Sequence, residues 1–235
     1  MSTFSRFAYS LAAISIVAVT IAGGVLKMPL PGLATNDSHL ISATSFPDPA
    51  IDIEVNPAVK EQTIVLAGGC FWGVEAVFEH LKGVSDVTSG YMGGDEATAN
   101  YPRVSTGTTA HAESVKITYD STQISYEQLL KVFFVVAHNP TELDRQGPDT
   151  GTQYRSAIFG SDEQQRVAQV YIDQLNAAKV FDRPIVTEIA SLSAFYPAEE
   201  HHQNFIDRNP NYPYVVVHDL PKLDRLREQF PNLYQ

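Results

Sequence analysis

The sequence has only one cysteine, Cys70, among its 235 residues. A single cysteine excludes an intrachain disulfide, a disulfide-stabilised scaffold and any zinc or iron–sulfur site built from several cysteines. The thiol is therefore either a structural group or a reactive one. A lone cysteine in an arbitrary context more often packs as a small apolar side chain, so the residues around Cys70 must decide between the two roles.

Positive charge is also scarce. The chain has 16 Lys and Arg against 27 Asp and Glu, which gives a formal net charge of −11. Nucleic-acid binding needs clustered basic residues that neutralise phosphates, and here they are scattered apart from Lys222, Arg225 and Arg227. We therefore expect no nucleic-acid partner. Charged residues make up only 18% of the chain and hydrophobic residues 44%, a composition that favours a folded core over disorder.

The N-terminal region has no charge between residues 7 and 26. An apolar run of this length can span a bilayer as a helix, and the single Arg6 before it also suits a secretory signal peptide. We expect residues 1–26 to be a cleaved signal peptide or a membrane anchor, so that the protein is exported, either secreted or periplasmic or anchored to a membrane. Residues 27–62 are rich in Pro, Ser, Thr, Asn and Asp and predict an extended linker.

From residue 63 to residue 235 the apolar pattern predicts one folded domain of alternating strands and helices. The expected strands cover residues 63–67, 84–91, 112–119, 155–159 and 184–190, and the expected helices cover 71–81, 126–137 and 161–179. Ser125 with Gln128, and Ser161 with Gln164, have the spacing of a capping box at a helix start. This order of elements predicts an α+β fold, a single-domain α/β sandwich around a mixed sheet.

Cys70 lies between the first expected strand and the helix that begins at Phe71. A thiol at this position faces unpaired backbone N–H groups and the positive end of the helix dipole, and both stabilise a thiolate. Gly68 and Gly69 permit a tight turn and the close approach of a substrate to the backbone. The arrangement predicts a reactive Cys70 whose pKa is lower than that of a free cysteine.

Glu113 lies on the apolar side of its expected strand. Successive residues of a strand face opposite sides, so Glu113 shares a face with Val115 and Ile117. A desolvated carboxyl group tends to stay protonated near neutral pH and then has a proton to donate. The alternatives are a carboxylate that reaches solvent at the strand end, or a buried ion pair with Arg155 or Arg103.

Three further polar residues, Tyr101, Asp149 and Tyr154, lie in expected loops. Loops often carry functional residues, although many polar loop residues are only solvated. His201 and His202 are adjacent, but the HExxH spacing of a zinc site is absent. We therefore expect no metal site at the two histidines.

Six short segments occur in order along the domain: GCFWG at 69–73, GYMGG at 90–94, NYPRV at 100–104, HAE at 111–113, GTQYRS at 151–156 and AEEHHQ at 198–203. Together they resemble the A-type peptide methionine sulfoxide reductases over nearly the whole domain. The resemblance implies that residues 63–235 form a catalytic domain of this family. It also implies the reduction of methionine-S-sulfoxide, free or in proteins, to methionine, a repair of oxidative damage that needs no metal or bound cofactor.

The resemblance also implies roles for individual residues. Cys70 corresponds to the nucleophile, which attacks the sulfoxide sulfur and becomes a sulfenic acid. Glu113 corresponds to the acid that protonates the sulfoxide oxygen, and Tyr101 and Tyr154 correspond to hydroxyl donors that hold it. The remaining correspondences are Phe71 and Trp72, walls of the apolar pocket for the substrate methyl group, and Asp149, a carboxylate of the site.

The chain departs from the many family members that have further cysteines near the C-terminus. Those cysteines resolve the sulfenic acid as a disulfide, but residues 209–217 here read NPNYPYVVV. We therefore expect an external thiol donor, of the thioredoxin, glutaredoxin or glutathione type, to restore Cys70 directly. We expect a monomer whose substrates are oxidised proteins or free methionine sulfoxide.

Two other classes of function stay open from the residues alone. A cysteine hydrolase or acyltransferase would pair Cys70 with a histidine such as His111 or His202, and would need an oriented imidazole base rather than a protonated Glu113. A non-enzymatic exported binding domain would bury Cys70 as an unreactive thiol. A phosphate-binding loop at residues 68–73 is disfavoured, because GGCFWG lacks the Lys and the Ser or Thr of a P-loop.

Overall fold

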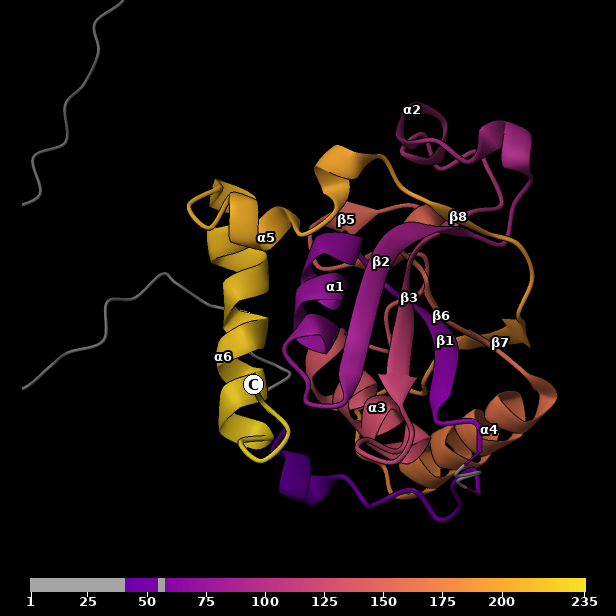
Figure 1. The fold of residues 1–235 in the computed structure, drawn as a ribbon, viewed down its shortest axis with the longest axis vertical. Coiled ribbons are helices and arrows are strands. Elements are labelled where there is room, and N and C mark those ends of the chain that lie inside the picture. Colours follow the sequence, from indigo (N-terminus) through magenta and orange to yellow (C-terminus); the bar gives the residue numbers. More distant parts are fainter. Residues whose placement is uncertain (1–40, 55–57) are drawn as a thin grey trace, which may run out of the picture. The chain divides into compact units, whose positions relative to one another are not determined.

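A six-stranded sheet forms the centre of the computed structural model, which describes residues 41–54 and 58–235 (Figure 1). Its strand order is β7-β6-β1-β3-β2-β8, and only the β6–β7 pair is parallel. The strands are β1 (Glu61–Gly68), β2 (Val84–Met92), β3 (Ala112–Asp120), β6 (Ser156–Gly160), β7 (Glu188–Ser191) and β8 (Phe195–Pro197). A separate two-stranded ribbon consists of β4 (Arg145–Gln146) and β5 (Asp149–Thr150).

The α-helices of the described chain are α1 (Phe71–Glu79), α2 (Tyr101–Val104), α3 (Tyr126–Val132), α4 (Asp162–Ala177), α5 (Phe205–Arg208) and α6 (Leu220–Gln229). A π-helical turn at Phe133–Ala137 continues α3, and another at Val215–Asp219 leads into α6. Both expected capping boxes are present, at Ser125 and at Ser161. The predicted α+β fold around a mixed sheet is confirmed, and all five predicted strands and three predicted helices are found with shifted ends.

The main hydrophobic core lies between the helices and one face of the sheet. Alternate residues of β1, such as Ile64 and Leu66, enter this core together with apolar side chains of α1, α3, α4 and α6. The opposite face carries only a small cluster that includes Val65 and Met92. In Figure 1, α1 lies along the sheet and α6 lies outside α1. Side chains of successive strand residues face opposite sides of the sheet, and the larger apolar set faces the side that the helices cover.

Residues 41–54, which the sequence assigns to the linker, pack against the domain. Phe46 is buried, and its ring contacts Phe181 edge-on at a centroid distance of 5.5 Å. The Ala43 N–H donates to Gln229 Oε1 at 2.7 Å. The apolar run at residues 7–26 lies outside the described residues. Within the described ranges, the structure has no helix that is long and apolar enough to span a membrane.

The strand register decides which loops meet. β1 and β2 both run antiparallel to β3. The C-terminal ends of β1 and β2 and the N-terminal end of β3 therefore lie together at one end of the sheet. Tyr91 pairs with Glu113 at this end of the sheet, and Cys70 follows β1 there. The fold therefore brings Cys70 and Glu113 to the same end of the sheet, although they are far apart in sequence.

Candidate active site

A cavity of about 180 Å³ lies at this end of the sheet. It is lined by Cys70, Phe71, Trp72, Tyr101, Glu113, Asp149, Tyr154, Tyr212 and Tyr214. All seven residues proposed from the sequence thus line one cavity, which they reach from α1, α2, β3, β5 and the turn before β6. Tyr212 and Tyr214 were not foreseen. The only sequence signal for them is the pair of tyrosines in the NPNYPY segment.

Cys70 is the N-cap residue of α1 and is partly exposed to the cavity. The preceding Gly69 has φ +92°, a left-handed conformation that favours glycine. A Cβ at Gly69 would also lie 2.5 Å from Cγ of Gln146. The turn that presents the thiol therefore requires glycine for its conformation and for its packing against β4.

The predicted lowering of the Cys70 pKa is wrong for the free protein. Burial raises the pKa of the thiol well above its ordinary value, and the carboxylates of Glu113 and Asp219 raise it further. The backbone N–H of Trp72 and the charge of Lys222 lower it, as a helix start and a cation should. The helix terminus thus acts in the expected direction but is outweighed by burial. Cys70 is a neutral thiol at rest.

Glu113 points from β3 toward the start of α1. Its side chain is 2% exposed, and its Oε2 accepts a hydrogen bond from the Phe71 N–H at 3.2 Å. Burial raises the pKa of Glu113 to about 8, the Phe71 bond lowers it, and Asp149 raises it slightly further. Among the described residues, Glu113 forms no salt bridge with Arg155 or Arg103, and Arg155 Nε instead bonds to Glu188 at 2.9 Å. Glu113 is therefore a protonated acid at neutral pH, as its place on the strand predicts.

Two phenols are available to a group in the cavity. Burial and the nearby Glu113 carboxyl raise the pKa of both Tyr101 and Tyr154, so both keep their protons. No hydrogen bond within the described residues engages either hydroxyl. The Tyr214 hydroxyl, in contrast, donates to Asp149 Oδ2. Tyr101 and Tyr154 can therefore donate to a bound oxygen, whereas Tyr214 is occupied by Asp149.

Trp72 forms one wall of the cavity and is held on several sides. Its ring stacks on Phe205 at 3.6 Å between centroids, and the rings of Tyr212 and Tyr214 meet it edge-on. Its Nε1–H donates to His202 Nδ1 at 3.2 Å. From the sequence, His202 is a candidate for a disfavoured metal site and for the imidazole of the hydrolase alternative. In the structure it is buried and orients the indole instead.

No histidine of the described chain lines the cavity with Cys70. His111 is buried, and its Nε2 contacts the Asp95 carbonyl at 3.0 Å. Within residues 41–54 and 58–235, no three His, Cys, Asp or Glu side chains converge to hold a metal ion. The geometry thus lacks the thiol–imidazole pair that the hydrolase alternative requires.

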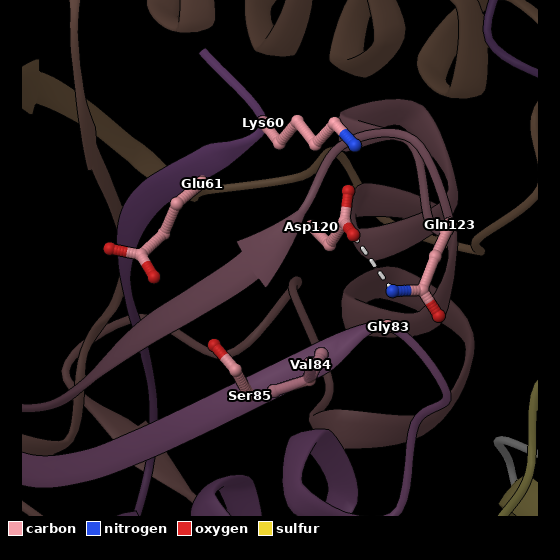
Figure 2. Close-up of a pocket in the computed structure, with 7 residues that line it drawn as sticks. All are labelled: Lys60, Glu61, Gly83, Val84, Ser85, Asp120 and Gln123. Atoms are coloured by element: carbon pink, nitrogen blue, oxygen red, sulfur yellow. Dashed lines mark hydrogen bonds between the residues drawn. The ribbon is translucent and has the colours of Figure 1, made fainter. Parts of the chain in front are cut away.

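A larger cavity, of about 430 Å³, lies at the opposite ends of β1, β2 and β3. Figure 2 shows its lining: Lys60, Glu61, Gly83, Val84, Ser85, Asp120 and Gln123. Hydrogen bonds from Thr122 and Gln123 to Asp120 close a turn and lower the pKa of this carboxyl to about 2. This cavity is lined by no cysteine and by no buried acid. We therefore place the chemistry at Cys70.

A thiol at a helix start, a neutral carboxylic acid and two free phenols around a small aromatic cavity define a thiol enzyme that protonates an oxygen of its substrate. The comparisons with known proteins agree. The family model "Peptide methionine sulfoxide reductase" matches residues 62–233. A peptide methionine sulfoxide reductase MsrA 2 from Synechocystis is 57% identical over 202 residues, covering 83% of this chain and 94% of the relative.

Other relatives and solved structures extend the match. MsrA 2 from Mesorhizobium japonicum is 58% identical over 178 residues and covers 75% of this chain and 91% of its own. Reduced Mxr1 from Saccharomyces cerevisiae has a TM-score of 0.58 at 35% identity, covering 68% of this chain and 91% of its own. Methionine sulfoxide reductase A of Corynebacterium diphtheriae has a TM-score of 0.57 at 35% identity, covering 71% and 84%. The chain belongs to the A-type peptide methionine sulfoxide reductase family.

Proposed function

We propose that the cavity reduces methionine-S-sulfoxide, free or in proteins, with Cys70 as nucleophile and Glu113 as acid. The cavity that joins the neutral Cys70 thiol, the neutral Glu113 carboxyl and two free phenols supports this assignment. Sγ of Cys70 bonds to the sulfoxide sulfur while Glu113 gives its proton to the oxygen. Glu113 takes up the thiol proton. The S–O bond and the bond between the two sulfur atoms then break as the hydroxyl passes to the Cys70 sulfur. Methionine leaves reduced by two electrons, and Cys70 is left as a sulfenic acid.

The raised pKa values of Cys70 and Glu113 suit this exchange. A sulfoxide oxygen leaves only when protonated, so the acid must carry its proton at the start. The thiol must lose a proton as its sulfur bonds, and the carboxylate just formed on Glu113 can accept it. Two neutral groups therefore become two neutral products without a net charge entering the buried cavity. Tyr101 and Tyr154 donate to the oxygen while charge develops on it.

The aromatic walls select the substrate. Phe71 and Trp72 line the cavity beside Cys70, and an aromatic face binds a methyl group through apolar contact. The methyl group of the sulfoxide then lies against these rings, and the oxygen faces Glu113. With the rest of the methionine side chain leading out of the cavity, these contacts fix the configuration at sulfur, and the other epimer would place its oxygen against the rings.

The single cysteine determines how Cys70 is restored. We propose that an external thiol of the thioredoxin, glutaredoxin or glutathione type attacks the sulfenic acid, releases water and leaves a mixed disulfide on Cys70. A second donor thiol then frees Cys70 and leaves the donor oxidised as a disulfide. Mass spectrometry after one turnover without reductant should find one added oxygen on Cys70. An intrachain link at Cys70 would refute the one-cysteine cycle.

Separated sulfoxide epimers test the activity. The full chain and Cys70→Ser are incubated with dithiothreitol and a peptide that contains either the S or the R epimer, and methionine is quantified. We expect turnover of the S epimer only, and none in Cys70→Ser. Circular dichroism confirms that the variant is folded. Equal turnover of both epimers, or an active Cys70→Ser, would contradict the proposal.

We also propose that the protein is exported or held at a membrane by residues 7–26. The uncharged run of these residues after Arg6 supports this. Fractionation of cells that express the full chain, with N-terminal sequencing of the recovered protein, separates a cleaved signal from an anchor. Recovery of the uncleaved chain in the cytosol would contradict both.

A further inference from the structure

An ion pair between a buried carboxylate and a partly exposed lysine lies against the first turn of α1. Lys222 Nζ is 3.3 Å from Asp219 Oδ1, and the Asp219 side chain is 0% exposed. Both residues belong to the segment that enters α6, the helix beside α1 in Figure 1. A Cβ built at Gly73 would lie 2.2 Å from Asp219 Oδ1 and 2.6 Å from Lys222 Nζ. Three residues after Cys70, the helix backbone thus lies directly against the two charges.

The pair is costly where it lies. Asp219 Oδ2 is buried and has no hydrogen-bond partner among the described residues. A buried ion pair with an unsatisfied oxygen is often no more stable than apolar residues of the same volume. Stability therefore does not account for these charges, and the helix they contact begins at the reactive thiol.

We propose that Asp219 and Lys222 are positioning residues for the nucleophile: Lys222 favours the thiolate of Cys70, and Asp219 opposes it by compensating the Lys222 charge. The two residues act on the same sulfur with opposite signs. Burial keeps the resting thiol neutral, and the paired charges leave little net field beside it. The cation remains in place to stabilise negative charge on sulfur during attack. The proposal rests on Cys70 being the nucleophile of the proposed function.

Other groups also face Cys70 and must be held constant in any test. They are Glu113 on β3, Asp149 on β5, Tyr101 on α2, Tyr154 before β6 and Tyr214 before the π-helical turn. The groups that face Asp219 are Lys222, His218 and Asp149. Among the groups that act on Cys70 in the described chain, Lys222 is the cation. Neutralising it removes the favourable charge without altering the lining of the cavity.

The rate at which iodoacetamide alkylates Cys70 across pH measures its thiolate fraction without any sulfoxide turnover. Full-length Lys222→Met should react about tenfold more slowly than wild type at pH 7, and Asp219→Asn about tenfold faster. Lys222→Arg keeps the charge and should react like wild type. The matched control is the exposed pair Asp224 and Arg227, 3.4 Å apart on the same helix. Asp224→Asn and Arg227→Met should leave the rate unchanged.

A slower alkylation rate in Lys222→Met together with a faster rate in Asp219→Asn supports the proposal, because loss of packing would change both rates in the same direction. Rates that change in the same direction, or do not change, would overturn it. If Asp219→Asn fails to fold, Lys222→Met against Lys222→Arg still decides, since Lys222 is partly exposed. Failure of the proposed function would be seen in a different experiment, as sulfoxide turnover by Cys70→Ser. The alkylation rate reports only the ionisation of Cys70.

Discussion

The backbone N–H of Phe71 donates a hydrogen bond to Oε2 of Glu113 at 3.2 Å. This bond joins the first residue of α1 to the start of β3, and so it fixes the acid next to the residue that follows Cys70. It also satisfies one of the free N–H groups of the helix start. The same contact that caps the helix therefore holds the Glu113 carboxyl group at the cavity.

Glu113→Gln should reduce kcat by about 100-fold or more, because the amide cannot donate an acidic proton to the sulfoxide oxygen. In the proposed mechanism the active form of Glu113 is the protonated acid, and its pKa is raised to about 8. The contribution of Glu113 to the rate should therefore fall as the pH rises above this value. Single-turnover rates from pH 6 to 10 measure it. Ionisation of Cys70 raises the rate with pH in both proteins, so the ratio of the wild-type rate to the Glu113→Gln rate is the readout. A ratio that does not fall above pH 8 would show that Glu113 does not act as an acid.

The same variant should be more stable than wild type in alkali. The folded state binds a proton at Glu113 up to pH about 8, whereas an unfolded Glu releases it near 4.5. Wild-type stability contributed by this group is thus full below pH 4.5 and is lost as the pH rises through 8, by at most about 5 kcal/mol. Thermal unfolding at pH 5 and pH 9 checks this. Equal pH dependence in both proteins would contradict it.

The position of Glu113 could be predicted from the sequence, whereas the pKa of Cys70 could not. Strand alternation alone places Glu113 beside Val115 on the buried face, and the pattern at β1 and α1 places Cys70 at a helix start. Both are local properties. The pKa of Cys70 depends on burial by residues distant in sequence and on Asp219, which no local pattern near Cys70 reveals.

The elements that sequence patterns missed are short or weakly apolar. β8 has three residues and β4 and β5 have two each, too few for a periodic signal. α6 buries only Leu226 completely among its ten residues. These elements nevertheless bring Asp149 and the Asp219–Lys222 pair to the thiol. The described part of the expected linker packs for a similar reason, since single residues such as Phe46 occupy sites that only the folded domain creates.

The phenols should differ in importance according to their partners. Tyr101→Phe and Tyr154→Phe should each lower kcat by about 10- to 100-fold, because each removes a donor to the developing oxyanion. Tyr214→Phe should lower kcat less, since its hydroxyl is already donated to Asp149. Steady-state kinetics with the S epimer ranks the three variants. A Tyr214→Phe defect as large as the other two would mean that its hydroxyl turns to the substrate.

Gly73→Ala should destabilise the protein by about 1–3 kcal/mol, because the added methyl overlaps a packed region. The atoms it would meet are the charged ends of Asp219 and Lys222. The cost should shrink when Asp219→Ala is combined with it, since the shorter side chain makes room. Urea unfolding of both single variants and the double variant measures this coupling. Additive losses would show that the two positions do not touch.

His202 should control the orientation of Trp72 through a bond that acid breaks. Nδ1 accepts from the indole N–H, so it must carry no proton. Burial and the nearby His201 lower the pKa of His202, while Glu199 raises it. The bond is therefore intact above about pH 6.5, the ordinary pKa of histidine, and is lost, with its contribution to stability, as the pH falls through the lower pKa of the folded state.

The fluorescence of Trp72 reports this directly, because it is the only tryptophan in the chain. Wild-type emission should change on acidification. His202→Gln keeps an acceptor oxygen but cannot titrate, so its emission should stay constant and its KM should remain near wild type. His202→Leu removes the acceptor and should raise KM about fivefold, the effect of one hydrogen bond. His201→Gln is the control for the neighbouring imidazole, and loss of the titration in this variant instead would assign the switch to His201.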